Sequence, residues 1–175
     1  MREFSADLSA AGGGHFALVA ADFTRDLSAQ LVAGAERELL AHGVAAERID
    51  CVWVPGAFEI PLACRRLVAA RDRPAGGEPS EPSKSSKPSK SKYAAVIALG
   101  AVIRGQTPHF DYVAGECARG VMQVGLDTGV PVIFGVLTTD SRAQAEQRAD
   151  PARADKGGAA ARAALAMAAL PAPPV

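Results

Sequence analysis

Four short apolar runs, separated by segments with helical periodicity, constrain the fold more than any other feature of the sequence. The runs cover residues 15–22, 49–55, 93–100 and 131–138, and the apolar residues within each are nearly continuous. Continuous runs of this length are typical of parallel strands that are covered on both faces. The sequence therefore predicts an α/β protein with a four-stranded parallel sheet.

The segments between and after these runs predict helices. Leu27, Leu31, Ala35 and Leu39 recur every four residues, and Gly43 follows them as a stop signal. The other predicted helices cover residues 57–71, 108–127, 141–149 and 156–170, and the helix at 108–127 ends before Gly129 and Pro131. Helical crossovers between parallel strands cover both faces of a sheet, so we predict a single domain, 1–175, that folds as a three-layer α/β/α sandwich.

Open parallel sheets bind their ligands beyond the carboxyl ends of the strands. Functional residues are therefore expected in the loops that begin near Phe23, Pro55, Ala101 and Thr138. Phe23 can stack on a planar ring or belong to the core. Glu59 can accept hydrogen bonds from hydroxyl groups, or it can simply favour the first turn of a helix.

The loop after the third run carries the motif GAVIRGQTPHFD at residues 100–111. It resembles the phosphate-binding pattern G-x-x-x-x-G-K-[ST], but Gln106 stands in the place of the lysine and cannot supply its charge, which argues against nucleotide hydrolysis. Thr107 and Pro108 are typical of a helix N-cap and first helical residue, and a helix N-terminus binds phosphate without lysine. An ordinary capped helix is the alternative.

His109 lies in the same loop, and its imidazole suits proton transfer near neutral pH, although an isolated histidine is commonly just polar surface. Asp111 would repel an anion if its carboxylate pointed toward the phosphate loop. Arg104 and Arg148 could bind a ligand, or they could be solvated or ion-paired.

Charge and hydropathy limit the classes of partner. Nineteen basic and nineteen acidic residues cancel, so neither nucleic acid nor an anionic membrane is an expected partner. The longest apolar stretch, 93–103, is too short to span a bilayer, and the N-terminus lacks the pattern of a signal peptide. We expect a soluble cytoplasmic protein.

The cysteines Cys51, Cys64 and Cys117 are odd in number and lack C-x-x-C spacing, which argues against a disulfide framework and against a zinc site. We expect all of them to be reduced and in or near the core. Residues 73–92 are rich in serine, lysine and proline, with Ala75 as the only ordinary apolar side chain, so a mobile surface loop or linker is predicted.

Four motifs, taken together, resemble the 6,7-dimethyl-8-ribityllumazine synthase family of riboflavin biosynthesis. They are VPGAFEIPLA at 54–63, ALGAVIRGQTPHFDYVAGECARGV at 98–121, PVIFGVLTTD at 131–140 and DKG at 155–157. The resemblance covers about residues 16–169 in order, apart from 73–92. It implies a flavodoxin-like sheet and a transferase that condenses 5-amino-6-(D-ribitylamino)uracil with 3,4-dihydroxy-2-butanone 4-phosphate, without a metal or organic cofactor.

The resemblance also implies the role of each site residue. His109 is expected to transfer protons beside the reacting carbonyl. The residues expected to bind the phosphate are Gln106, Thr107 and Arg148. Those expected to bind the ring and ribityl chain of the uracil substrate are Phe23, Gly56, Ala57, Glu59, Ala101, Val102, Ile103, Phe134 and Lys156.

In this family each site lies between adjacent subunits of a pentamer, so Phe134, Arg148 and Lys156 are expected to come from the neighbouring copy. The resemblance is compatible with a sixty-subunit shell of twelve pentamers and with association with riboflavin synthase, and it leaves the choice between pentamer, decamer and 60-mer open. It also implies a flexible or subunit-bridging segment at 1–14. The chain departs from the family pattern in two places: 73–92 resembles an insertion of about fifteen residues, and Thr24 stands where asparagine is common.

Two other functions stay open at this point. A shell or flavin-binding scaffold without catalysis would use residues 73–92 to recruit a partner. A flavodoxin-like mononucleotide carrier would share the sheet architecture, but it would not explain why phosphate-loop residues, His109 and Arg148 occur together.

Overall fold

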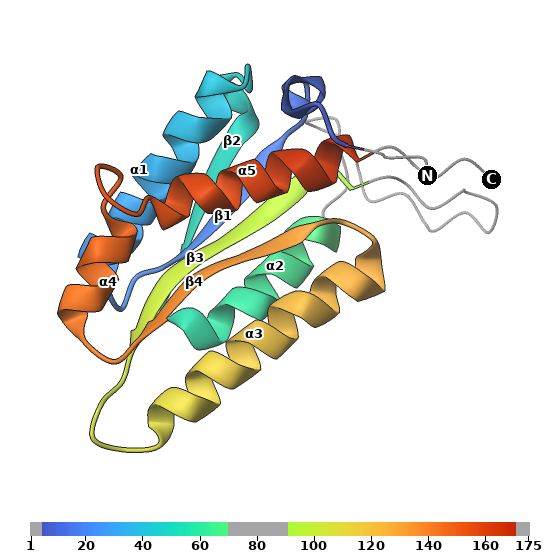
Figure 1. Ribbon diagram of the computed structural model, residues 1–175. Coiled ribbons are helices and arrows are strands. Elements are labelled where there is room, and N and C mark those ends of the chain that lie inside the picture. Colours follow the sequence, from blue (N-terminus) through green and yellow to red (C-terminus); the bar gives the residue numbers. More distant parts are fainter. Residues whose placement is uncertain (1–4, 70–90, 171–175) are drawn as a thin grey trace, which may run out of the picture.

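The computed structural model describes residues 5–69 and 91–170. Its sheet has four parallel strands in the order β2-β1-β3-β4, with β1 (Phe16–Ala21), β2 (Ile49–Val54), β3 (Ala95–Ile103) and β4 (Val132–Thr139) (Figure 1). Each strand coincides with one of the apolar runs, so the prediction of a four-stranded parallel sheet is confirmed.

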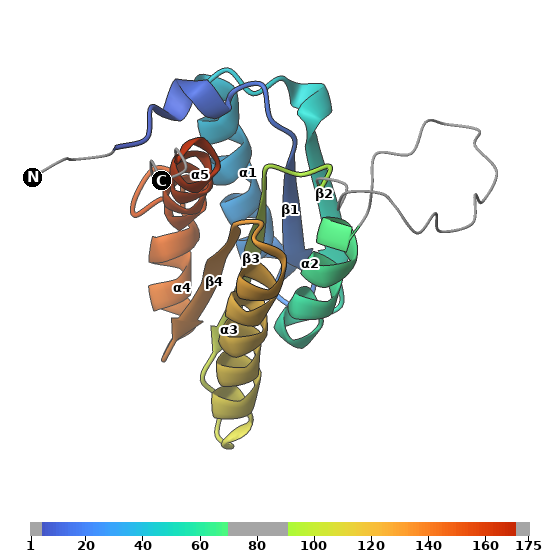
Figure 2. The same cartoon turned by 90° about the vertical axis from the view of Figure 1, so that its right-hand side faces the viewer.

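Helices cover both faces of this sheet. One face carries α1 (Arg25–Ala41), α4 (Arg142–Ala149) and α5 (Lys156–Ala169), and the other carries α2 (Ile60–Ala69) and α3 (His109–Thr128) (Figures 1 and 2). The predicted three-layer α/β/α sandwich of flavodoxin-like type is confirmed. The elements follow the predicted order, with an extra helix after β4.

The side chains of β1 show why the apolar runs are continuous. Phe16 and Leu18 belong to the core that α1 and α5 close, whereas Ala17, Val19 and Ala21 belong to the core on the side of α2 and α3. All of them are fully or almost fully buried. Successive side chains of a strand point to opposite faces, so a strand between two helical layers has no position for a polar residue.

The predicted helix stops are confirmed at Gly43 and Gly129, which have φ angles of +85° and +70°. Both angles lie in the left-handed region, where glycine meets no steric penalty from a Cβ atom. These two glycines turn the chain away from α1 and α3 and into the approach to the next strand.

The helices α1 and α5 pack closely because glycine lies at their contact. A Cβ atom on Gly157 would overlap the backbone carbonyl of Leu31, and one on Gly34 would overlap the carboxylate of Asp155. Asp155 is the N-cap of α5, and it accepts hydrogen bonds from the Gly158 N–H (3.1 Å) and from Arg37 (2.7 Å). These contacts place Lys156, the first residue of α5, beside β4.

Two predicted segments lie partly outside the described residues. Of the segment 73–92 only Ser91 and Lys92 are described, and Lys92 donates a hydrogen bond to Asp50 (2.9 Å). The Tyr93 hydroxyl donates to the same carboxylate (2.7 Å), and this bond is the largest cause that lowers the pKa of Asp50. In the N-terminal segment, Leu8–Ala11 forms a 3₁₀ helix that packs against the core, and its predicted bridging role stays a prediction.

The cysteines divide between the core and the surface. Cys64 and Cys117 are buried between the sheet and the helices α2 and α3, where burial raises the pKa of their thiols to about 12 and about 11. Cys51 is exposed, so its predicted place in or near the core was wrong. The reason is that β2 lies at the edge of the sheet, where the helices cover it incompletely. No helix within 5–69 and 91–170 has the length and hydropathy to cross a membrane.

Candidate active site

A difference in strand length at the carboxyl edge of the sheet opens the site. β1 ends at Ala21, whereas β3 continues to Ile103 and is paired beyond Gly100 with β4 alone. Residues 101–103 therefore have no strand beside them on the β1 side. The predicted loop start near Ala101 was wrong, because pairing with β4 extends the strand and moves the loop to Arg104.

The loop from β1 to α1 places Phe23 at the mouth of this opening. The Asp22 N–H donates to the Val54 carbonyl (2.8 Å) and the Phe23 N–H donates to the Pro55 carbonyl (3.0 Å), so the loop continues the pairing of β1 with β2. The phenyl ring itself is 87% exposed. Of the two interpretations of Phe23, the core residue is wrong, and an exposed ring on a fixed backbone is suited to stacking.

Thr24 connects this loop to β3. Its hydroxyl donates to the Ala101 carbonyl (3.2 Å), which is one of the groups that β1 leaves without a strand partner. Thr24 is also the N-cap of α1, but its side chain makes no capping hydrogen bond. The threonine at this position therefore holds the Phe23 loop against the lining strand.

The turn after β2 forms the opposite wall. Ala57–Glu59 is a 3₁₀ turn that leads into α2, and the Glu59 N–H donates to the Gly56 carbonyl (3.3 Å). The Glu59 carboxylate folds back over Gly56, since a Cβ atom built there would lie 3.2 Å from its Oε2 atom. Glu59 is exposed, so its oxygens are free to accept hydrogen bonds from a ligand.

The motif at 100–111 covers the end of β3, the loop 104–108 and the start of α3. The predicted N-cap at Thr107 was wrong: Pro108 is the N-cap, because its carbonyl accepts the first helical hydrogen bond, from the Asp111 N–H (3.0 Å). No side chain caps the first turn of α3, and the N–H groups of His109 and Phe110 have no acceptor within the helix. The Thr107 hydroxyl is thus not used by the helix.

These elements enclose a cavity of about 730 Å³. Its lining contains nine of the predicted site residues, namely Phe23, Gly56, Ala57, Glu59, Ala101, Val102, Ile103, Thr107 and His109. Gln106 belongs to the same loop and is exposed, but it does not line the cavity. Glu59 is the only fully charged side chain among the described lining residues, so no Lys or Arg lies in the wall.

The arginine of this loop, Arg104, is ion-paired. Arg104 contacts Asp111 (Nη2 to Oδ1, 3.1 Å) and Asp140 (Nε to Oδ1, 3.2 Å), and its guanidinium lies 4.1 Å from the centroid of the Phe110 ring. The hydrogen bond to Asp111 is the largest cause that raises the pKa of Arg104. Of the two interpretations of Arg104, the ion pair is therefore the one that the structure shows.

The three remaining predicted site residues line a second hollow, of about 390 Å³, between β4 and α5. They are Phe134, Arg148 and Lys156. Phe134 is 40% exposed, although it lies in a strand, and the Arg148 guanidinium donates to the Gln144 carbonyl of its own helix (3.1 Å). The two hollows share no lining residue, because β4 and the end of β3 stand between them.

The large cavity combines groups for binding and for proton transfer. An exposed aromatic ring can stack on a planar ligand, a carboxylate and strand carbonyls can hold hydroxyl groups, and an imidazole at a helix start can move protons. Within 5–69 and 91–170 no group of three or more His, Cys, Asp or Glu is placed to hold a metal ion. The second hollow offers two cations that could bind an anion.

Several lining residues were not predicted from the sequence. They are Thr24, Phe58, Gly105, Phe110, Tyr112 and Val113. Phe58 lies inside the motif PGAFE and was available as a signal. Tyr112 and Val113 follow His109 by three and four residues, which is the spacing that puts side chains on one face of a helix.

A comparison with known proteins agrees with the arrangement of these loops. A family model described as 6,7-dimethyl-8-ribityllumazine synthase matches residues 13–172 of the 175-residue chain. The match includes all residues of both hollows. Members of this family are transferases of riboflavin biosynthesis. The chain belongs to the 6,7-dimethyl-8-ribityllumazine synthase family.

Proposed function

We propose that this protein condenses 5-amino-6-(D-ribitylamino)uracil with 3,4-dihydroxy-2-butanone 4-phosphate to form 6,7-dimethyl-8-ribityllumazine, releasing phosphate and water. This is the penultimate step of riboflavin biosynthesis. Family membership supports the proposal, and so does a cavity of about 730 Å³, a size typical of small-molecule sites. The reaction is expected to need no metal or organic cofactor.

The uracil substrate would occupy the part of the cavity between Phe23 and β3. Phe23 would stack against the pyrimidine ring, and Ala101–Ile103 would contact the ring edge through backbone groups that β1 leaves open. Gly56 and Ala57 would pass beneath the ribityl chain, with the Glu59 carboxylate accepting hydrogen bonds from its hydroxyl groups.

The second substrate would enter at the start of α3. Gln106, Thr107 and the free N–H groups of the first helical turn would hold its phosphate. His109 would then lie beside the reacting carbonyl and transfer protons during Schiff-base formation, phosphate elimination and ring closure. Much of the rate would come from holding two substrates together, so loss of His109 is expected to be less severe than loss of a covalent nucleophile.

The separation of the two hollows is the observation that carries the proposal of a shared site. One hollow contains the ring-stacking, hydroxyl-binding and proton-transfer residues, and the other contains Arg148 and Lys156. A neighbouring copy that brings its second hollow to the first would supply the cation that a phosphate needs. Because the two surfaces differ, the contact would be head to tail, and such a contact forms a ring, such as the expected pentamer, when its rotation closes.

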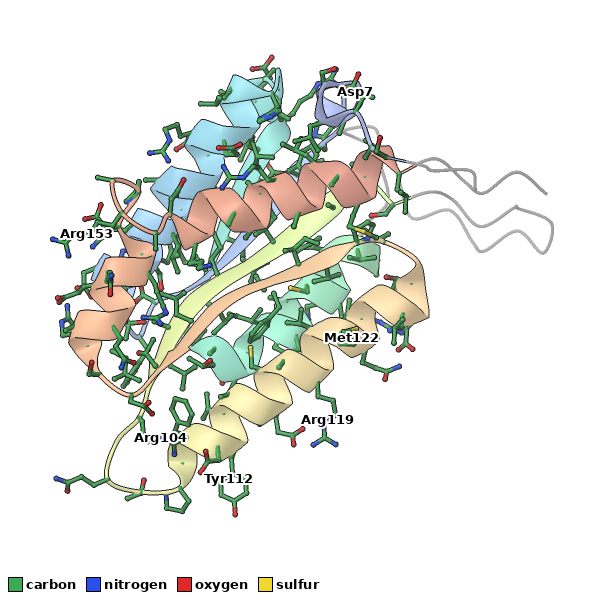
Figure 3. All side chains as sticks on the ribbon, viewed as in Figure 1. Asp7, Arg104, Tyr112, Arg119, Met122 and Arg153 are labelled. Atoms are coloured by element: carbon green, nitrogen blue, oxygen red, sulfur yellow. The ribbon has the colours of Figure 1, made fainter. Side chains whose placement is uncertain are left out.

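Exposed apolar residues on α3 also support assembly. Tyr112, Met122 and Leu126 are 67%, 63% and 73% exposed, and Figure 3 shows Tyr112 pointing away from the sheet. Apolar side chains gathered on one helix commonly mark an interface. A pentamer is therefore proposed, while the sixty-subunit shell, the association with riboflavin synthase and the cytoplasmic location stay predictions.

A direct assay tests the reaction. The purified full chain is mixed with both substrates in the presence of a chelator, and lumazine fluorescence, phosphate release and native particle mass are measured together. Lumazine and phosphate are expected in equal amounts from an oligomer. A control reaction without the amine substrate should release phosphate much more slowly.

Other outcomes would favour the alternative functions. A correctly assembled oligomer that forms no lumazine would contradict the proposed reaction. Tight binding of riboflavin without turnover would point to the scaffold, and bound redox-active FMN would point to the mononucleotide carrier. Activity in an isolated single chain would contradict the shared site while leaving the reaction itself intact.

A further inference from the structure

Arg104 joins three structural elements at the entrance of the phosphate loop. It follows β3 directly, and its backbone N–H donates to the Thr139 carbonyl at the end of β4 (2.8 Å). Its guanidinium contacts Asp111 in the first turn of α3 twice (3.1 and 3.5 Å) and Asp140 after β4 once (3.2 Å). Figure 3 shows the labelled Arg104 side chain at this junction.

All three guanidinium nitrogens of Arg104 are already used. Nε donates to Asp140, and Nη1 and Nη2 donate to the two oxygens of Asp111. The planar group also lies over the Phe110 ring, at 4.1 Å from its centroid, and Phe110 lines the large cavity. A guanidinium in this arrangement is poorly placed to turn toward a ligand, because it would have to break several charge-assisted bonds.

One of the two carboxylates, that of Asp111, lies next to the place where the proposed function puts an anion, and Arg104 links it to the carboxylate of Asp140. Asp111 is two residues after His109, in the same first turn of α3 in which the N–H groups of His109 and Phe110 have no acceptor within the helix. Two carboxylates and one guanidinium give this junction a net charge of −1, and removing the guanidinium would leave −2. Asp111 and Asp140 are 59% and 75% exposed, so their charges reach the solvent at the loop.

We propose that Arg104 is a positioning residue for the phosphate-bearing substrate, which it serves by holding Asp111 and Asp140 in ion pairs and so reducing their repulsion of the phosphate. This inference rests on the proposed function. Arg104 does not contact the phosphate; Arg148 of the neighbouring copy keeps that role. The phosphate loop accepts an anion beside Asp111 because Arg104 neutralises that carboxylate.

The test is steady-state kinetics of Arg104→Met in the full chain, with each substrate varied in turn. Methionine keeps an unbranched side chain that can pack on an aromatic ring, but it removes the charge. We expect KM for the phosphate-bearing substrate to rise about tenfold at low salt, the scale of one partly screened charge. KM for the uracil substrate should change less than about twofold, since that substrate carries no phosphate. The midpoint of thermal unfolding should stay close to that of the wild type, because exposed ion pairs contribute little to stability.

Two further variants separate charge from structure. Arg104→Lys keeps the positive charge and should keep KM for the phosphate-bearing substrate within about threefold of the wild type. The double variant Arg104→Met/Asp111→Asn returns the junction to a net charge of −1 and should recover most of the lost affinity. At high salt all four proteins should converge in KM, because the charges are screened.

Three results would each overturn the role of Arg104. They are an equal rise of both KM values, an Arg104→Lys variant whose KM for the phosphate-bearing substrate is as high as that of Arg104→Met, and a double variant whose KM does not recover. Absence of lumazine formation by the wild type would instead contradict the proposed function. In that case binding of inorganic phosphate, followed by ³¹P NMR, tests Arg104 by itself: the wild type should bind about tenfold more tightly than Arg104→Met, and equal binding would overturn the inference.

Discussion

The two hollows of this protein differ in what each lacks. The large cavity at the ends of β1, β2 and β3 has an aromatic ring, a carboxylate and an imidazole, but no Lys or Arg among its described lining residues. The smaller hollow between β4 and α5 has Arg148 and Lys156, but it is little more than half as large and has no titratable imidazole. Each holds the chemistry that the other is missing.

This contrast follows from the order of the strands in the sheet. The strand order puts β2 at one edge and β4 at the other, so the two hollows open in different directions from the same sheet. Within one chain Arg148 and His109 line different hollows, and β4 is paired with β3 along its whole length. Under the proposed function, association of two copies would bring the two sets of groups together, and activity would then depend on assembly.

Gly157→Ala is expected to have the largest effect, because it destroys the smaller hollow. The added methyl group would overlap the Leu31 carbonyl and push α5 away from α1, at a cost of about 3 kcal/mol or more. Thermal unfolding and native mass should show a destabilised chain that fails to assemble. The matched control is Gly125→Ala, in α3, where the nearest atoms are at an ordinary 3.6 Å. Equal stability of the two variants would contradict the close packing of α1 on α5.

Mixing two inactive variants tests the division of the site directly. His109→Ala and Arg148→Ala should each lower kcat/KM by about a hundredfold. For His109→Ala this is the lower end of the usual rate contribution of proton transfer. For Arg148→Ala it reflects the loss of the positive charge opposite the phosphate. Co-expressed in equal amounts, they should regain about a quarter of wild-type turnover, because random head-to-tail contacts join two intact halves at one interface in four. His109 lines the large cavity, and Arg148 lines the smaller hollow.

The control for this experiment is Arg153→Ala. Arg153 is 64% exposed and pairs with Asp150 three residues earlier, outside both hollows, and Figure 3 shows it at the turn between α4 and α5. It should keep full activity. A mixture of His109→Ala and Arg148→Ala that stays inactive, although the particles contain both chains, would mean that the two hollows do not serve one site.

Phe23→Ala tests whether the larger cavity binds the uracil substrate through stacking on Phe23. Loss of stacking should raise KM for the uracil substrate about tenfold, the scale of an aromatic contact, and leave KM for the phosphate-bearing substrate almost unchanged. The melting temperature should not fall, because the ring is 87% exposed. Phe23→Trp keeps an aromatic surface and should remain close to the wild type. A large loss of stability would instead show that the ring supports the core.

Thr24→Val is expected to have the smallest effect. It removes the hydroxyl that donates to the Ala101 carbonyl while keeping the shape of the side chain. We expect a loss of about 1 kcal/mol, or roughly fivefold in kcat/KM, from the freed Phe23 loop. Thr24→Ser, which keeps the hydroxyl, should recover the activity. If Thr24→Val equals the wild type, the hydrogen bond does not position the loop.

Much of the fold could be predicted because its signals are local. The four apolar runs became the four strands, and the glycines at 43 and 129 ended the helices as expected. The errors arose where pairing partners decide the outcome. Ala101 belongs to a strand because β4 continues beside it, and Pro108 replaces Thr107 as the cap because its carbonyl accepts the first helical bond.

By itself the sequence determined the strands, the helices and the family, because side-chain periodicity and the motifs at 54–63 and 98–121 depend only on neighbours in the chain. The tertiary structure decided which residues from distant parts of the chain lie beside each other. The contact of Thr24 with Ala101 joins residues 77 positions apart, and the contact of Arg104 with Asp140 joins residues 36 apart. Such contacts follow from strand order and relative strand length, which no local pattern encodes. The same order placed Arg148 and His109 in separate hollows, although both lie within the residues that the family model matches.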